Sequence, residues 1–386
     1  MGSGLQFSLV LGLMSHMKAQ KVLIFTAGAG AGHISCSHAL KNALLEKEKD
    51  LDVQVVDMYL LSKVTAKNGR LYSLVGRVPL FETVYNLIHI LVDKYRWFAK
   101  LAEFVALRPL YKPTMKVIEE NDPDIVVGNN ALLIPVLDWC RRRKEFRYFV
   151  TVTDLITVCR WWASELADTV FVPTEEAEKI LKKYSHNCNI ARDYFSFRRI
   201  EPLSEEKKVE VFENFFSGTT FSPTKPLIVV TGGGFSTRKI MKGIKKYIES
   251  SHHQFVILTG KDKVLYDELQ VEFVEDDNVL ILGFTDRNLD LIAIADVVIS
   301  KFGSVSVVEL EEMNKKTIFT KPVGYQEYGN VEYIKRNRNF VFVGSNHRQV
   351  VIEIERFLVD DYESSTAHIQ NASAIAEYIL QKRPVP

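Results

Sequence analysis

The sequence has few cysteines, no long apolar run and almost no net charge. Its four cysteines show no CxxC or metal-ligand spacing, so we expect free thiols of a cytosolic protein. They are Cys36, Cys140, Cys159 and Cys188. No apolar run reaches the roughly 18 residues that a membrane-spanning helix needs. The net charge of +1 favours no class of partner, so local clusters of charge carry more information.

Motifs for phosphate loops and metals are also missing. The glycine-rich turn at 231–236 lacks the Gly-Lys-[Ser/Thr] ending of a P-loop, and the turn at 26–33 fits no GxGxxG fingerprint well. No Asp-x-Asp pair stands at the end of a predicted strand, so a divalent metal is allowed but not indicated. We expect no tightly bound cofactor and no nucleic-acid partner.

The length of 386 residues is too large for one comfortable core and suits two domains. We expect an unstructured or non-native extension over 1–19, because its apolar stretch lacks the flanks of a signal peptide. A short membrane-touching tail is the other option. Strand patterning lapses over 192–225, which predicts an N-terminal domain at 20–200 and a C-terminal domain at 201–362. The segment 363–386 is predicted to be helical and could return to the first domain.

The stretch 296–334 is the most informative part of the sequence. It alternates strand, turn and helix twice, which predicts parallel strands with polar turns at their carboxyl ends, where ligands bind in such sheets. Ser304 is a candidate N-cap whose helix would present free N–H groups to a phosphate. Glu309 could accept hydrogen bonds from two ribose hydroxyls. Taken one at a time, these residues favour the plainer interpretation, in which Ser304 is only a cap and Glu309 is a solvated helix charge.

The order of residues over 300–333 reads S-K-x-G-x-x-S-x-x-E, then Pro322, then Q-E-x-G-N-x-x-Y. This order resembles glycosyltransferase family 28, which comprises the monogalactosyldiacylglycerol synthases and the related peptidoglycan GlcNAc transferases. The resemblance implies an α/β protein with the GT-B fold, in which two doubly wound, Rossmann-like domains face an interdomain cleft. It also implies transfer of a sugar from a UDP-sugar donor with inversion.

The resemblance assigns the donor site to the second domain. The glycine-rich turn at 231–236 would lie near the diphosphate, and Phe284 and Thr285 would lie beside the uracil. Glu309 would bind the ribose, and Gln326 and Glu327 would bind the hexose hydroxyls. The full set of expected UDP-sugar-binding residues is Gly233, Gly234, Phe284, Thr285, Lys301, Gly303, Ser304, Ser306, Glu309, Gln326, Glu327 and Asn330.

The resemblance places the acceptor and the chemistry in the first domain. His33, at the end of the first glycine-rich turn, becomes the candidate general base, and its ordinary pKa near 6.5 suits that task. Asp154, in a Thr-Asp-Leu turn, is a candidate to orient His33 or an acceptor hydroxyl. The sequence departs from the family at Asn129-Asn130, where a His-Pro pair is expected, and at Cys159, where a histidine is expected.

Apolar and basic residues alternate at helical spacing over 68–119. This pattern suits either a helix lying on an anionic membrane surface or an ordinary amphipathic helix with a solvated basic face. The family resemblance favours the membrane. The expected acceptor or membrane contacts are Tyr95, Trp97, Phe98 and Trp162.

Together these patterns predict a bacterial, membrane-associated hexosyltransferase on the cytoplasmic, inner face of the cell membrane. It would move galactose or glucose from a UDP-sugar to a hydroxyl lipid such as diacylglycerol or a sterol. The alternatives are a peptidoglycan-type UDP-GlcNAc transferase, a UDP-sugar epimerase of the same fold, or a nucleotide-binding relative without activity.

Overall fold

The structure, a computed structural model, describes residues 19–28, 31–61, 79–322, 324–344, 346–360 and 369–381. The expected extension at 1–19 therefore lies almost wholly outside the described residues. The same holds for 68–78 of the predicted amphipathic region and for parts of the segment 363–386.

The first domain is built on a six-stranded sheet in the order β2-β1-β3-β4-β5-β6, and every pair is parallel. Its strands are rich in Val, Ile and Phe, as expected for strands that are covered on both faces. They are β1 (Lys21–Thr26), β2 (Asp52–Asp57), β3 (Ile125–Gly128), β4 (Arg147–Thr151), β5 (Thr169–Val172) and β6 (Ile190–Arg192). The sequence pattern did not predict β6.

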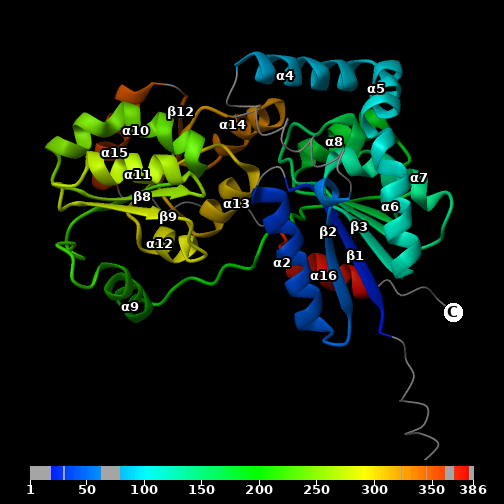
Figure 1. The fold of residues 1–386 in the computed structure, drawn as a ribbon, viewed down its shortest axis with the longest axis horizontal. Helices are drawn as coiled ribbons and strands as arrows, with labels where there is room; N and C mark the ends of the chain where they lie inside the picture. The colour runs from blue at the N-terminus through cyan, green and yellow to red at the C-terminus, as the bar shows by residue number, and fades with distance from the viewer. Residues whose placement is uncertain are drawn as a thin grey trace, which may run out of the picture.

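Helices cover both faces of this sheet (Figure 1). Between β2 and β3 the chain forms a helical arm, in which the first helix that the structure describes, α4, lies across the top of the molecule toward the second domain. The helices are α2 (Ala31–Lys47), α4 (Pro79–Lys94), α5 (Arg96–Ala102), the π-helix η2 (Glu103–Leu107), α6 (Arg108–Asn121), α7 (Ile134–Arg141) and α8 (Glu175–Tyr184). Single 3-10 turns are η1 (Met58–Leu60), η3 (Ala131–Leu133) and η4 (Arg160–Trp162).

The second domain repeats the plan, with a parallel sheet in the order β12-β11-β10-β7-β8-β9. Its strands are β7 (Leu227–Val230), β8 (Gln254–Gly260), β9 (Val279–Gly283), β10 (Val297–Ser300), β11 (Thr317–Thr320) and β12 (Phe340–Gly344). Its helices are α10 (Gly233–Ser250), α11 (Lys263–Glu272), α12 (Asn288–Ile294), α13 (Ser304–Glu312), η5 (Tyr325–Glu327), α14 (Tyr328–Ile334) and α15 (His347–Val359). The prediction of two doubly wound α/β domains is confirmed.

Two connections join the domains. The first leads through α9 (Glu205–Phe216), whose N-cap Ser204 accepts a hydrogen bond from the Lys207 amide. The second brings the chain back, so that α16 (Ala372–Gln381) packs against α2 and the first sheet. Ile375 and Ile379 of α16 are fully buried in that core.

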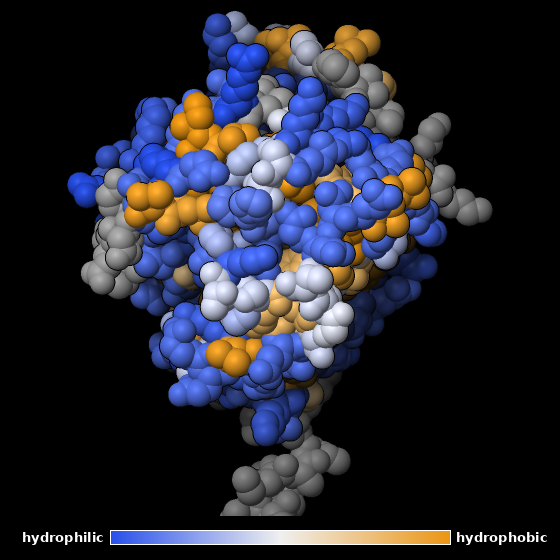
Figure 2. Space-filling model, turned by 90° about the vertical axis from the view of Figure 1, so that its left-hand side faces the viewer, coloured by the Kyte–Doolittle hydropathy of each residue, from blue (hydrophilic) through white to orange (hydrophobic). Residues whose placement is uncertain are grey.

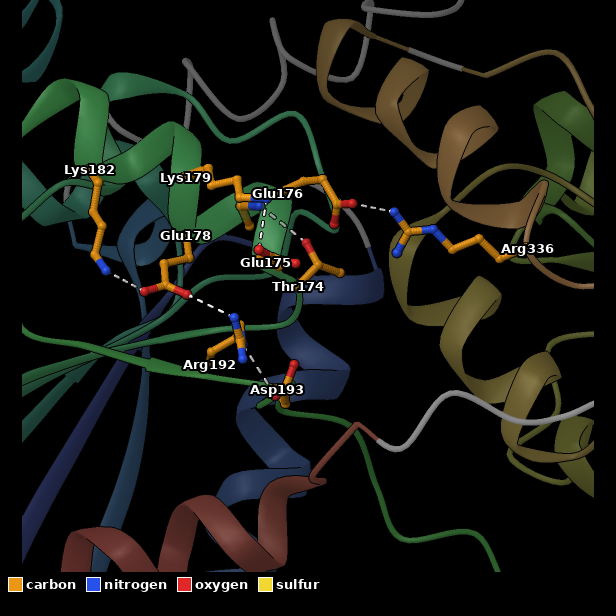
Figure 3. A network of polar contacts seen from close by, with 10 residues as sticks. Thr174, Glu175, Glu176, Glu178, Lys179, Lys182, Arg192, Asp193 and Arg336 are labelled. Atoms are coloured by element: carbon orange, nitrogen blue, oxygen red, sulfur yellow. Dashed lines mark hydrogen bonds and ion pairs between the residues drawn. The ribbon is translucent and has the colours of Figure 1, made fainter.

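Direct contacts also hold the domains together. The Glu176 carboxylate at the start of α8 accepts a hydrogen bond from Arg336, just beyond α14 (Figure 3). Thr174 caps the start of α8, the helix that carries Glu176, and the Thr174 hydroxyl oxygen lies 3.2 Å from the Ala177 amide nitrogen. Gly329 of α14 lies so close to the first domain that an added Cβ would sit 2.7 Å from the Thr157 backbone nitrogen. The described structure is therefore a closed arrangement of the two domains.

We expect Ile375→Ala to lower the free energy of unfolding by about 2–5 kcal/mol, because it opens a cavity between α16 and the first sheet. Thermal and urea unfolding would measure the loss. The matched control is Glu377→Ala on the same helix, whose half-exposed ion pair with Lys47 should matter by less than about 1 kcal/mol. Equal stability of the two variants would show that α16 does not contribute to the first core.

Candidate functional site

A pocket lies where the carboxyl ends of the first sheet face the second domain. It encloses about 640 Å³, including its open mouth. The first domain contributes residues that follow four adjacent strands, β2, β1, β3 and β4, and two residues of α4. The second domain contributes two residues of η5. The lining includes His33, Asn130, Asp154, Cys159, Trp162, Tyr85, His89, Tyr325 and Gln326.

His33 occupies the first turn of α2 at the wall of this pocket. Its Nδ1 atom lies 3.1 Å from the Thr153 hydroxyl oxygen, so the ring is held by a hydrogen bond from the turn after β4. Burial lowers the pKa of His33, and the Lys301 ammonium acts in the same direction, while contacts with Asn129 oppose the shift. The imidazole is consequently neutral at physiological pH, the form that can accept a proton.

Asp154 lies on the same wall with a different environment. Its Oδ2 atom accepts a hydrogen bond of 2.6 Å from the indole of Trp162, a fully buried residue. Burial raises the pKa of Asp154 to about 7; the Trp162 hydrogen bond opposes the shift, and the carboxylates of Glu327 and Asp93 add to it. The hydrogen bond to His33 comes from Thr153, and both predicted tasks of Asp154 stay predictions.

The turn after β10 brings donor-side residues to the cleft. Lys301 Nζ lies 3.5 Å from Glu327 Oε1, which joins two of the predicted donor residues. The N-cap of α13 is Gly303, so the prediction of Ser304 as N-cap is wrong. Ser304 is the first helical residue, and its hydroxyl accepts a hydrogen bond from Asn330 Nδ2 at 3.2 Å. Asn330 also donates a hydrogen bond of 2.9 Å to the Phe302 carbonyl and thereby holds the turn between β10 and α13.

Glu309 is only 8% exposed, and its environment was not foreseen. Its Oε1 atom accepts a hydrogen bond of 3.2 Å from Arg198 Nε, which comes from the segment connecting the domains. Burial raises the pKa of Glu309, and the Arg198 charge and hydrogen bond oppose the shift. A role at the ribose remains a prediction, with Arg198 as a partner that nothing in the sequence pattern indicated.

The other expected donor residues follow strands of the second sheet. Gly233 and Gly234 open α10 directly after β7, the neighbour of β10. Phe284 follows β9, is 68% exposed and has the Lys261 ammonium 5.2 Å from its ring centroid. The Thr285 hydroxyl accepts a hydrogen bond from the Arg287 amide. Ser306 is half-buried in the first turn of α13.

The helical arm carries most of the exposed apolar side chains of the first domain. Trp97 is 66% exposed and Phe104 is 60% exposed, whereas Phe98 packs against the core. Tyr95 is partly exposed, with the Lys94 ammonium 5.2 Å from its ring centroid. Figure 2, which faces the second domain, shows a mostly hydrophilic surface with apolar groups at the upper rim, at the height of α4 in Figure 1.

No described helix is long and apolar enough to cross a bilayer. Within the same residues, no three His, Cys, Asp or Glu side chains gather in a way that could hold a metal ion.

Solved structures of low sequence identity share the two-domain architecture. The UDP complex of MnaA from S. aureus matches 94% of this chain and 95% of its own, with a TM-score of 0.56 and 14% identity. MurG from Acinetobacter baumannii matches 94% of this chain and 99% of its own, with a TM-score of 0.52 and 11% identity. These matches define the class: the chain has the GT-B fold.

Two family models match consecutive parts of this chain. The model of monogalactosyldiacylglycerol (MGDG) synthase matches residues 33–191, and that of the glycosyltransferase family 28 C-terminal domain matches 227–336. The resemblance of the motifs to glycosyltransferase family 28 is thereby confirmed.

Curated relatives match nearly the whole chain. A processive diacylglycerol beta-glucosyltransferase of Bacillus licheniformis is 24% identical over 370 residues, which cover 92% of this chain and 93% of the relative. The protein of the same name from Bacillus subtilis is 24% identical over 349 residues, with 89% and 88% coverage.

The pKa of Asp154 predicts a pH-dependent stability. Between about pH 4 and pH 7 the folded protein keeps a proton on Asp154 that the unfolded chain has released. This contribution to stability is therefore complete below about pH 4 and is lost as the pH rises to about 7. Relative to Asp154→Asn, the wild type should lose about 2–3 kcal/mol of unfolding free energy between pH 5 and pH 8.

Urea unfolding at both pH values, followed by tryptophan fluorescence, would measure this difference. Asp277→Asn, which changes an exposed aspartate of the second domain, serves as the control and should keep a constant offset from the wild type. A constant offset for Asp154→Asn as well would contradict the assigned environment of Asp154.

Proposed function

We propose that the protein transfers a hexose from a UDP-sugar to the hydroxyl group of a membrane lipid, with diacylglycerol as the acceptor class. The names of the curated relatives and the match to the galactolipid synthase family support this acceptor. The observation that carries the proposal is the pocket between the domains. Its lining brings neutral His33 and Asp154 of the first domain to Gln326 of the second.

The proposed reaction uses this arrangement in one displacement. Neutral His33 takes the proton of the acceptor hydroxyl as its oxygen forms a bond to the anomeric carbon. The bond from that carbon to the UDP oxygen breaks, and the configuration inverts because attack and departure occur on opposite faces. The leaving diphosphate gains negative charge, which Lys301 and the N-termini of α10 and α13 would stabilise.

Other residues take supporting roles in the proposal. Gln326 and Glu327 bind hexose hydroxyls, and the ion pair with Lys301 holds Glu327 beside the diphosphate. Protonated Asp154 can donate a hydrogen bond to the acceptor, since burial keeps the proton on it up to about pH 7. The Thr153 hydroxyl, 3.1 Å from His33 Nδ1, helps to hold the His33 ring at the wall of the pocket.

The exposed arm is the proposed contact with an anionic membrane, on the inner face of the cell membrane. Trp97 and Phe104 present apolar surface beside a run of basic residues, a combination that favours anionic lipid headgroups. The basic residues are Lys94, Arg96, Lys100, Arg108, Lys112 and Lys116.

We expect His33→Ala to lower the rate of transfer by about 100-fold to 10,000-fold, because it removes the proposed general base. The assay incubates the protein with labelled UDP-glucose or UDP-galactose and mixed membrane lipids and separates the lipid products. UDP affinity, measured by calorimetry, should stay within about twofold. His38→Ala, an exposed histidine on the same helix, is the control and should keep full activity. Unchanged turnover of His33→Ala would remove His33 as the base.

The double change Trp97→Ser and Phe104→Ser should weaken binding to vesicles that contain anionic lipid, because it removes apolar area from the arm. Flotation of the protein with vesicles would show that the ratio of bound to free protein drops by at least about tenfold. Val271→Ser removes an equally exposed apolar group from the second domain and should have no effect. Equal flotation of the double variant and the wild type would rule out the arm as the docking surface.

A further inference from the structure

One face of α4 contacts η5 of the second domain. Three residues of α4, spaced four apart so that they share a face, contact consecutive residues of the second domain. The Tyr85 hydroxyl donates a hydrogen bond of 3.2 Å to Gln326 Oε1. The rings of His89 and Tyr325 stack with centroids 6.2 Å apart and an interplanar angle of 25°. The Asp93 carboxylate is hydrogen-bonded by Tyr325.

The backbone before η5 is shaped to fit this face. Gly324 has a φ of 85°, a left-handed conformation that favours glycine. A Cβ there would lie 3.4 Å from the Tyr85 ring and 3.2 Å from Gln326 Oε1. The absence of a side chain therefore lets the chain pass against Tyr85 and places Gln326 within reach of its hydroxyl.

The last turn of α4 is held in place by the first domain. Asp93 Oδ1 accepts a hydrogen bond of 2.8 Å from the Arg160 amide. The Arg160 guanidinium donates to the Val92 carbonyl at 3.1 Å and to the Asp93 carbonyl at 2.7 Å. These bonds tie the last turn of α4 to η4, so the helix presents a fixed surface to η5.

We propose that Tyr85, His89 and Asp93 are positioning residues of the first domain that hold η5 in the geometry that binds the donor hexose. This inference rests on the proposed function and deepens it, because it assigns control of the donor-sugar subsite to the acceptor domain. Gln326 is an amide whose oxygen is engaged by Tyr85, which leaves its NH₂ group directed to an acceptor atom such as a sugar hydroxyl oxygen.

The assignment has a specific consequence for binding. Loss of the Tyr85 hydroxyl frees the Gln326 amide to rotate, so hydrogen bonds to the hexose are lost or misdirected. The UDP part of the donor is expected to bind through α10, α13 and Phe284, none of which belongs to η5. A change at Tyr85 should therefore weaken the affinity for UDP-hexose and spare the affinity for UDP.

The experiment compares the wild type with Tyr85→Phe, which removes one oxygen atom and keeps the ring. Calorimetry would give the Kd values for UDP, UDP-glucose and UDP-galactose. We expect the Kd for the preferred UDP-hexose to rise about threefold to tenfold, the loss typical of one hydrogen bond, with the Kd for UDP within about twofold of the wild type. The KM for UDP-hexose should rise, with the KM for the lipid unchanged.

The matched control is Tyr266→Phe on α11, because that hydroxyl also forms a hydrogen bond with a glutamine, Gln270, 3.1 Å away. It should leave all three Kd values unchanged. Gly324→Ala provides a second variant and should weaken UDP-hexose selectively, as Tyr85→Phe does.

Two outcomes would overturn the inference: an unchanged ratio of UDP-hexose to UDP affinity in Tyr85→Phe, or an equal loss for both ligands. A wild-type protein that binds no UDP-hexose would overturn it as well. A wild type that binds UDP-hexose but glycosylates no lipid would defeat the proposed function alone, while the affinity ratio would still decide the role of Tyr85.

Discussion

The approach of Lys301 to both His33 and Glu327 is the interaction on which the proposed site depends. The ammonium belongs to the second domain, lies 3.5 Å from Glu327 and acts electrostatically on His33 of the first domain. One cation therefore lowers the affinity of the base for its proton and holds a donor-side carboxylate. The effect on His33 requires the closed arrangement, because His33 belongs to the first domain whereas Lys301 and Glu327 both belong to the second.

That closed arrangement follows from the way each sheet ends. Parallel strands bring all their carboxyl ends to one edge, and the turns at those edges carry the polar residues. In the first domain the edge supplies His33, Thr153 and Asp154. In the second it supplies Lys301, and η5 follows β11 at the same edge. The core is apolar on both faces of each sheet, so polar side chains are left to gather between the domains.

The sequence predicts the fold well because buried parallel strands read as short β-branched runs followed by glycine or polar turns. The same turns located His33 and Asp154. The sequence could not predict partners that are distant along the chain, such as Arg198, which meets Glu309 across 111 residues. The cap of α13 was also missed, since Asn330 engages the Ser304 hydroxyl from another helix. The signal for Thr153 was present beside Asp154, but its hydroxyl points to His33 only in the folded chain.

The double connection between the domains limits how the protein can open. The outgoing chain at Tyr194 and the returning chain at Gln370 lie side by side in a parallel bridge. The Phe195 amide donates to the Gln370 carbonyl, and the Gln370 amide donates to the Asp193 carbonyl. Two chains fastened at one point resist twisting better than a single linker does. Any separation of the domains therefore has to bend the chain outside this bridge or break the hydrogen bonds that form it.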